Sequence, residues 1–546
     1  MSSTKPASAA AADQVAGNLI LFNDNGAWCW YQDPRTMIDR TNGLMMMGSV
    51  PAREGIDGEK RAGNIELTSF NLATGERKVF VLHEKLEVDD HDAPALWTRP
   101  DGRYLAMYAK HNTDKFSRWR VSVNPHDPTA WTPERTFDWT PLIDPVDNAT
   151  YSNLHYLSSE KRLYNFVRGI NDDPSIMVSM DNGDTWSYGG KLLTIEKLGY
   201  VNGYVRYASN GVDRIDFITT EHHPRDFNNS IYHGYVKGTK LQRSDGTVVD
   251  ENVLDGDGKP QTLLTKIFAA DSVVGGEKMT HAWTTDLRLD PQGNPVAIIS
   301  CRANDDPENS NYNDHRFFYA RFDGKDWKVN QLAKAGARRW EAEQDYTGLV
   351  SIDPHDVNTV YASTTVDPRD GSSLAHHEIF KGVTGDSGAT WKWEPITQNS
   401  SVDNLRPIVV PGDDNVHAVL WFRGTMTRSQ HYDMAAVGVV EQKSEKVGPI
   451  VFAQGSKLPA LADGSYDLFV FFKGNPAGDA SIRAGLSANG MLHYRQRACQ
   501  QTEAGQFRGY LGRVKVSGGS SAQPMVDDST KDSLLGFGYA PVTTQR

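Results

Sequence analysis

Short runs of β-branched and aromatic residues alternate with Asp-Gly, Asn-Gly and proline turns along most of the chain. Long stretches with the 3.6-residue apolar spacing of an amphipathic helix are absent. β-branched and aromatic residues favour strands, and Asp-Gly or Asn-Gly pairs favour tight hairpin turns. The pattern therefore predicts an all-β protein.

One unit of strand, turn, strand, polar loop and further strands recurs roughly every 45–60 residues. Its copies begin at Trp28, Pro94, Leu154, Tyr204, Asp286, Gly348 and Ile408. Sheets of about four strands repeated around an axis make a β-propeller. The repeats predict a seven-bladed propeller over residues 18–445, and the early strand from Leu19 is placed to complete the last blade and close the ring.

Two hairpins carry a Ser/Thr-x-Asp-x-Gly-x-Thr-Trp pattern, the Asp box. They are SMDNGDTW at residues 179–186 and TGDSGATW at residues 384–391, and FDGKDW from Phe322 is a degenerate relative. We expect the Asp side chain to cap a tight turn in which Gly supplies the unusual backbone angles. The pattern supports a propeller and says nothing about its chemistry.

The two ends of the chain lie outside the repeat. Residues 1–17 are small and polar, without the basic start and apolar stretch of a signal peptide, and predict a disordered leader. Residues 446–546 still contain strand-like runs such as YDLFVFFKG. They predict a small C-terminal β extension packed on the propeller, with a separate binding module as the alternative.

The composition excludes several classes of binding partner. The net charge of −12 argues against broad nucleic-acid binding, which needs a basic surface. No apolar run approaches the roughly 20 residues of a membrane helix. Three cysteines, Cys29, Cys301 and Cys499, make no disulfide framework. A few arginines in one cleft can still attract an anionic sugar chain.

Reactive side chains recur at equivalent places in the repeat. In a blade, the start of the innermost strand and the end of the second strand lie on one face. His91 and His111 hold these two places in one unit, and Tyr151 and Arg168 hold them in the next. The second strands of later units end at Glu221, His222, His223, Arg225, Cys301, Arg302 and Arg423. A single histidine at a strand end is usually structural, but this recurrence predicts a functional funnel.

The residue types fit β-elimination at a uronic acid. Removal of the C5 proton needs a base, neutralisation of the neighbouring carboxylate, and an acid for the departing O4; His, Tyr and Arg supply these roles. A glycoside hydrolase would instead use two carboxylates, from the candidates Asp89, Asp90, Asp92, Glu221, Glu343 and Asp345. A sialidase-like site would use Tyr151 with Arg168, Arg302 and Arg423, but the Arg-Ile-Pro start expected there is missing.

Several long motifs resemble one family of propellers. They are AWCWYQDPR from Ala27, DDHDAPALWTRPDGRYLAMYAKHN from Asp89, TYSNL with FVRG, HHPRDFNNSIYHGYV from His222, DHRFFYARFDG from Asp314 and EQDYTGLVSIDP from Glu343. Together, over roughly residues 18–445, they resemble the propeller-type ulvan lyases and related propellers that cleave rhamnose-α-1,4-glucuronate linkages as lyases or rhamnosidases.

The resemblance implies a lyase that cleaves rhamnosyl-uronate bonds of sulfated ulvan and leaves 4,5-unsaturated uronate ends. It implies proton transfer by His111 and Tyr151, with Tyr156 as a rival to Tyr151, charge neutralisation by Arg168, and a second transfer or positioning role for His91. Which of His111 and Tyr151 is the base stays open. Substrate binding is expected at Arg225, Arg302, Asn112, His222 and Arg423. The alternatives are an exo-lyase or α-L-rhamnosidase on plant-type glycans, and a non-catalytic glycan-binding propeller.

The family resemblance also implies a structural zinc. The candidate ligands are His223, Cys301, His315 and His281, and mixed His/Cys ligation suits this ion. We expect no organic cofactor, an anionic polysaccharide (ulvan) as partner, no nucleic-acid or membrane partner, and a monomer. The substrate class leads us to expect a secreted or periplasmic protein.

Overall fold

The protein is almost entirely β-structure. The computed structural model describes residues 12–144, 147–198, 203–304, 312–341, 343–443, 445–474, 476, 482–486, 490–493, 499–502, 504–518 and 522–544. Within these residues, regular helix is limited to the four-residue α1 (Gly58–Arg61) and short 3-10 turns. The predicted all-β class is therefore confirmed. No helix in the described ranges is long and apolar enough to cross a membrane.

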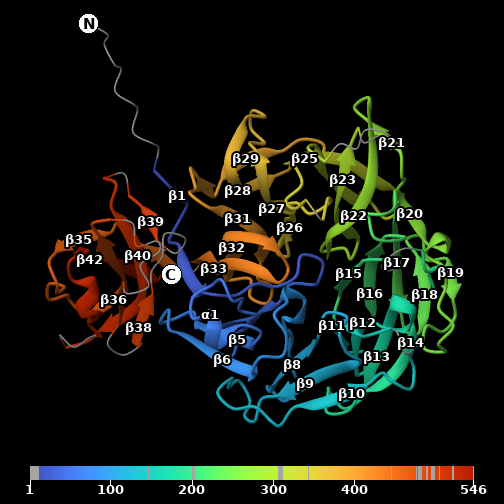
Figure 1. Ribbon diagram of the computed structural model, residues 1–546, viewed down its shortest axis with the longest axis horizontal. Coiled ribbons are helices and arrows are strands. Elements are labelled where there is room, and N and C mark those ends of the chain that lie inside the picture. The colour runs from blue at the N-terminus through green and yellow to red at the C-terminus, as the bar shows by residue number, and fades with distance from the viewer. Residues whose placement is uncertain are drawn as a thin grey trace, which may run out of the picture.

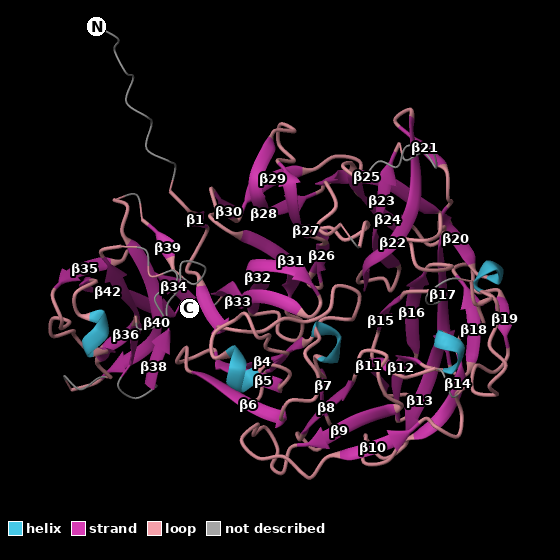
Figure 2. Cartoon of the chain, viewed as in Figure 1, coloured by secondary structure: helices cyan, strands magenta, loops and turns pink. Residues whose placement is uncertain are grey.

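Antiparallel sheets follow one another in chain order around a ring (Figures 1 and 2). The first of these sheets contains β3 (Thr36–Asp39), β4 (Leu44–Ser49), β5 (Ile65–Asn71) and β6 (Arg77–His83). The second contains β7 (Ala95–Thr98), β8 (Tyr104–Ala109), β9 (Phe116–Val121) and β10 (Arg135–Asp138). The next runs β11 (Thr150–Leu157), β12 (Arg162–Arg168), β13 (Pro174–Ser179), β14 (Ser187–Lys191).

The following sheets are larger. One contains β15 (Val205–Ser209), β16 (Arg214–Thr219), β17 (Ile231–Lys237), β18 (Lys240–Arg243), β19 (Val248–Asp250) and β20 (Thr265–Phe268). The other contains β21 (Ser272–Val274), β22 (Glu277–Leu289), β23 (Pro295–Ala303), β24 (His315–Phe322) and β25 (Trp327–Gly336). β26 (Val350–Asp353), β27 (Asp356–Val366), β28 (Ser373–Val383) and β29 (Lys392–Pro395) form the sheet after them.

The ring is closed by strands from both ends of the repeat. β31 (Asp403–Val409), β32 (Val416–Arg428) and β33 (His431–Gln442) share a sheet with β2 (Ile20–Asn23). β2 pairs antiparallel with β33, with Ile20 opposite Gly438 and Leu21 opposite Val437. The prediction that the strand from Leu19 closes the ring is confirmed.

Apolar side chains fill the spaces between neighbouring sheets. Between β8 and the β12–β13 pair, for example, Leu105 and Met107 pack with Leu163 and Met177, and all four are fully buried. Burial of such a side chain contributes roughly 1.5–3 kcal/mol. Alternation of inward and outward residues along each strand therefore holds adjacent sheets face to face.

A segment between β2 and β3 occupies the centre of the ring (Figure 1). Within it, Tyr31 stacks on Trp283 at a centroid distance of 3.5 Å, and the Trp30 indole N–H donates to the Thr347 carbonyl at 2.8 Å. Trp30 also packs against Tyr346. The segment thus contacts distant sheets from inside and forms a floor on which the candidate site is built.

The predicted 1–17 leader is ordered at its end, while residues 1–11 lie outside the described part of the chain. β1 (Gln14–Val15) pairs with β30 (Thr397–Gln398), and the buried Asp13 forms an ion pair with Arg423. The prediction of disorder was wrong for residues 12–17, because a buried charge pair and strand pairing fix them.

The C-terminal residues form further β-structure beside the ring (Figure 1). One sheet contains β34 (Glu445–Val447), β35 (Val451–Gln454), β36 (Gly464–Phe472), β39 (Gln500–Gln501), β40 (Phe507–Val516) and β42 (Leu534–Thr544); another contains β37 (Arg483–Leu486), β38 (Gly490–His493) and β41 (Pro524–Val526). The Gln500 side-chain amide donates to the carbonyls of Val15 and Gly17, both at 2.9 Å. The sheet that contains β39 is therefore attached to the N-terminal segment.

The two Asp-x-Gly hairpins share one hydrogen-bond pattern. Asp181 accepts the Thr185 backbone N–H at 2.8 Å and the Thr185 hydroxyl at 2.5 Å. Asp386 accepts the same two groups of Thr390 at 2.8 and 2.6 Å. The carboxylate in each case fastens a tight turn on the outer strands.

Candidate active site

His91 lies on a tight turn that leads into β7. Residues Asp90–Asp92 form a 3-10 turn, and the Asp89 carboxylate caps it by accepting the His91 backbone N–H at 3.0 Å. The Gln32 amide donates to the His91 carbonyl at 2.6 Å, and the Asp90 N–H donates to the Ser429 carbonyl at 3.1 Å. The backbone at His91 is therefore held by the central segment and by the β32–β33 hairpin.

One carboxylate connects both predicted histidines. Asp89 Oδ1 lies 2.6 Å from His91 Nδ1, and Asp89 Oδ2 lies 2.8 Å from His111 Nδ1. The two imidazole rings are stacked, with centroids 3.6 Å apart and planes 4° from parallel. Gln430 donates its side-chain amide to the same Asp89 carboxylate. Because Asp89 engages Nδ1 of each ring, Nε2 is the nitrogen left for other chemistry.

The two stacked histidines have opposite charge preferences. Burial opposes the charge on His91, yet the electrostatic interactions with Cys29, Asp89 and Tyr151, in that order, raise its pKa well above the usual value. Burial and the charge of His91 lower the pKa of His111 to about 4. Although burial opposes it, the two imidazoles keep the pKa of Asp89 well below its usual range. At neutral pH the arrangement favours an imidazolium at His91 beside a neutral imidazole at His111.

Tyr151 and Arg168 lie behind this pair. Thr150 pairs with Arg168 across β11 and β12, and the irregular register after Thr150 gives Tyr151 a φ of 72°. Such a backbone is costly for a bulky residue and persists where the surroundings enforce it. The Tyr151 ring lies 5.7 Å from that of His91, and the Arg168 guanidinium lies 4.8 Å from the Tyr151 ring. Tyr156, the rival, packs on Trp97 at the opposite end of β11.

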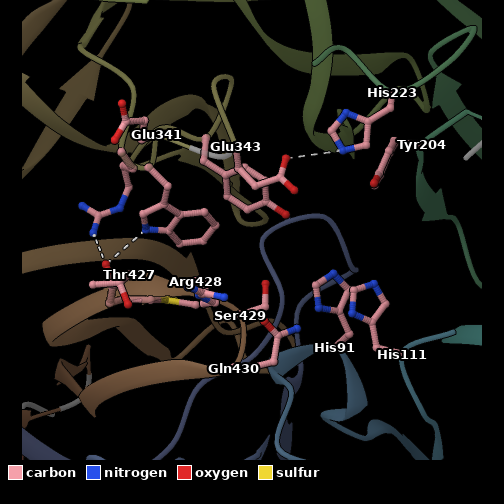
Figure 3. A pocket seen from close by; sticks show the side chains of 14 residues that line it. His91, His111, Tyr204, His223, Glu341, Glu343, Thr427, Arg428, Ser429 and Gln430 are labelled. Carbon is pink, nitrogen blue, oxygen red and sulfur yellow. Dashed lines mark hydrogen bonds and ion pairs between the residues drawn. The ribbon is translucent and has the colours of Figure 1, made fainter. Parts of the chain in front are cut away.

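A cavity of about 600 Å³ opens above the stacked histidines (Figure 3). It is lined by His91, His111, Tyr204, His223, Arg339, Trp340, Glu341, Glu343, Tyr346, Met426, Thr427, Arg428, Ser429 and Gln430. Tyr151 and Arg168 instead line a small hollow of about 20 Å³, which shares Tyr204 with the main cavity. The structure therefore brings the four predicted catalytic residues together, with two at the cavity surface and two buried beneath it.

The wall opposite the histidines is charged (Figure 3). Glu343 Oε1 accepts from the Arg225 guanidinium at 3.0 Å, and Glu343 Oε2 lies 3.7 Å from His223 Nε2. Burial raises the pKa of Glu343, although Arg225 opposes this shift. Burial and the Arg225 charge lower the pKa of His223 to about 3. Arg225 thus acts on the cavity through its ion pair with Glu343. The sequence had predicted Arg225 near the site, but not this ion pair.

Three predicted substrate-binding residues lie elsewhere. Arg302 is buried and donates to both carboxylate oxygens of Asp345, at 2.6 and 2.7 Å. His222 packs on Phe227 and lines a different hollow. Asn112 follows His111 with a left-handed φ of 57°, and its carbonyl accepts from a neighbouring side chain. None of the three lines the cavity above His91.

The prediction for Arg423 requires a correction. Arg423 is fully buried, forms an ion pair with Asp13, and donates to Asn404 Oδ1 at 2.9 Å. Its strand-end position was equivalent to that of Arg168 in the repeat, but the N-terminal segment covers it. Arg423 therefore fastens β1 to the ring and does not face the cavity.

The predicted zinc ligands are not brought together. In the β23–β24 pair, Cys301 is opposite Arg316, whereas His315 is opposite Arg302, one position along. Neighbouring positions on a strand point to opposite faces, so Cys301 and His315 project to different sides of the sheet. Cys301 lies in an apolar cluster, and burial raises its thiol pKa. Among the described residues, no three of His223, Cys301, His315 and His281 come within ligating distance of one another, so the zinc set does not fit.

Sequence reasoning missed several cavity residues. Tyr204 and Gln430 had no assigned role, and Glu343 was considered only as a hydrolase carboxylate. Asp89, named in the sequence analysis among the hydrolase carboxylates, is found to bind both histidines. The polar sequence Thr427–Gln430 at a hairpin tip was the available signal, but its contact with Asp89 spans 341 positions of the chain.

The family is shown by comparison with known proteins. The family model described as "BNR repeat-containing family member" matches residues 58–335, about half of the chain. The chain belongs to this BNR repeat-containing family. No curated protein sequence matches it.

Solved structures share the fold at low sequence identity. A polysaccharide lyase of the PL25 ulvan lyase family, bound to -[GlcA(1-4)Rha3S]-, is 14% identical, with a TM-score of 0.52 over 78% of this chain and 96% of that one. The polysaccharide lyase Uly1 is 12% identical, with a TM-score of 0.46 over 79% and 100%. The likeness to the PL25 structure confirms in the fold the resemblance to propeller-type ulvan lyases that the motifs indicated.

Proposed function

We propose that this protein is a polysaccharide lyase that cleaves a rhamnose-(1→4)-uronate linkage of an anionic glycan of the ulvan type by β-elimination. One observation carries the proposal: a stacked His91–His111 pair on a single buried carboxylate, at the surface of a cavity and backed by Tyr151 and Arg168. The ulvan lyase fold supports it. The order of the sheets around the ring also supports our reading of seven blades.

The chemistry divides among these side chains according to their charge. His91, favoured as an imidazolium, neutralises the uronate carboxylate at the cavity surface, and the buried guanidinium of Arg168 adds positive charge from behind it. Both charges make the C5 proton more acidic. Neutral His111 accepts that proton at Nε2, the nitrogen not held by Asp89. The C5–H electrons form the C4=C5 double bond, the C4–O4 bond breaks, and the Tyr151 hydroxyl protonates O4.

Tautomer control is the protein's main contribution to this step. Asp89 fixes Nδ1 of both rings, so the lone pair of His111 is directed away from Asp89. The parallel stacking holds the cationic and neutral rings at a fixed separation. Because the groups are positioned before substrate binds, little reorganisation is needed during the reaction.

A hydrolase is the second candidate, and Glu343 is the observation in its favour. Its raised pKa and its place in the cavity suit a general acid. Such an α-L-rhamnosidase would release rhamnose and leave no double bond. We rank it second because the stacked histidines have no role in that reaction.

Absorbance near 235 nm during incubation with ulvan tests the proposal. A rise with the wild-type protein that His111→Ala lacks is the expected result, because the C4=C5 bond conjugates with the carboxylate. Release of rhamnose without a rise in absorbance would show that the protein is a hydrolase and not a lyase. Binding of the glycan without any product would leave a non-catalytic propeller.

A further inference from the structure

The β32–β33 hairpin places an arginine at the cavity that the proposed reaction does not use. β32 ends at Arg428, Ser429 and Gln430 form the turn, and β33 begins at His431, which pairs with Arg428. Arg428 is exposed, and it lines the same cavity as His91 and His111 (Figure 3).

The hairpin is fixed to the turn that carries His91. The Ser429 carbonyl accepts the Asp90 backbone N–H at 3.1 Å, and Gln430 donates to the Asp89 carboxylate. These contacts involve the two residues that directly follow Arg428. The position of the Arg428 backbone relative to the stacked histidines is therefore set by the fold, and only its side chain is free to adjust.

Other arginines near the cavity already have acidic partners. Arg339 donates to Asp403 at 3.0 Å, and Arg225 donates to Glu343 at 3.0 Å. Within the described part of the chain, the Arg428 guanidinium has no carboxylate partner. A guanidinium that is open to a cavity suits a planar or tetrahedral oxyanion, to which it can donate two parallel hydrogen bonds.

We propose that Arg428 is the receptor for an oxyanion on the sugar chain, at a residue next to the one that is cleaved. This inference rests on the proposed function, which places an anionic glycan in this cavity. The oxyanion is a sulfate ester or the carboxylate of another uronate. Arg428 acts in recognition and takes no part in proton transfer, so it determines which glycans enter productively.

The kinetics of Arg428→Gln on ulvan and on desulfated ulvan test the inference. Loss of one charge-assisted contact that substrate and transition state share should raise KM about tenfold and leave kcat within about twofold. Arg53→Gln is the matched control, because Arg53 is exposed and does not line the cavity. An effect on ulvan alone identifies the sulfate ester, and an equal effect on both substrates identifies the carboxylate.

Two results would overturn the inference: an unchanged KM on both substrates, or a loss confined to kcat. Calorimetric binding of the glycan to wild type, Arg428→Gln and Arg53→Gln separates this failure from failure of the proposed function. If wild type forms no unsaturated product but Arg428→Gln binds about tenfold more weakly, the receptor stands and the lyase does not. If product forms and the affinity is unchanged, the lyase stands and the receptor does not.

Discussion

Replacing Asp89 with Asn tests whether one buried carboxylate organises both imidazoles. Asp89 accepts the Nδ1–H groups of His91 and His111, at 2.6 and 2.8 Å, and the His91 backbone N–H at 3.0 Å. Asn has one accepting oxygen, and its amide group donates. His91 Nδ1 also lies 2.7 Å from Asp90 Oδ1, so a change of tautomer or the loss of a carboxylate partner falls mainly on His111.

The size of the effect follows from this arrangement. Removing one partner from a buried ion pair costs about 3–5 kcal/mol, and a hydrogen bond to a charged group contributes about 1.5–3 kcal/mol. Since Asn keeps one accepting oxygen, we expect Asp89→Asn to lower the free energy of unfolding by about 3 kcal/mol. A wrong histidine tautomer lowers turnover by about 10⁴-fold in a serine protease triad, and we expect a kcat loss of about 10³–10⁴ here.

Turnover at 235 nm and denaturant unfolding of the same samples measure both quantities. Asp92→Asn is the matched control: Asp92 lies on the same turn and is fully buried, and burial together with the charge of Asp89 raises its pKa well above the usual value. Asn therefore replaces a carboxyl whose neutral form burial favours. The reasoning is refuted if Asp89→Asn keeps kcat within about tenfold of wild type, or if Asp92→Asn loses as much activity.

Three further predictions concern proton transfer, pH and the N-terminal segment. Tyr151→Phe should lower kcat about 10²–10⁴-fold at 235 nm while Tyr156→Phe does not, and equal losses would reverse the assignment. Because the pKa of His111 is lowered to about 4, kcat should fall only below about pH 4, and a fall centred near pH 6.5 would contradict this role. The same shift makes stability in denaturant titrations decrease from pH 6.5 towards pH 4, where the unfolded chain takes up a proton that the folded protein excludes. Asp13→Asn leaves Arg423 buried without its anion and should cost about 3 kcal/mol in unfolding experiments, and a loss below about 1 kcal/mol would show that β1 does not need the pair.

Local patterns predicted most of the fold. The hairpin between β7 and β8 was visible because apolar alternation and an Asp-Gly turn are encoded within a few residues. The pairing of β2 with β33 was also predicted, although it is distant in sequence, because the repeat lacked one strand at its end. Because equivalent strand ends of the repeat lie on one face, the sequence also predicted that His91, His111, Tyr151 and Arg168 lie close together, as they do in the structure.

The same equivalence failed where neighbouring chain segments decide what a strand end contacts. Arg423 holds the place that Arg168 has in another sheet, but Asp13 covers it. Cys301 and His315 lie on paired strands, yet the register turns them to opposite faces. A strand-end position predicts the neighbourhood of a side chain, whereas its partner depends on register and on segments that the repeat does not include.

Closure of the ring and assembly of the candidate site depend on the same residues. β2 pairs with β33, the strand that follows the Ser429–Gln430 turn, and this turn contacts Asp89 and Asp90. The segment directly after β2 supplies Gln32, which holds the His91 carbonyl. If β2 did not pair with β33, the segment that forms the floor of the site and the β32–β33 hairpin beside the histidines would both lose their positions. The geometry of the imidazole pair is thus a product of the complete ring, which explains why no single repeat contains the site.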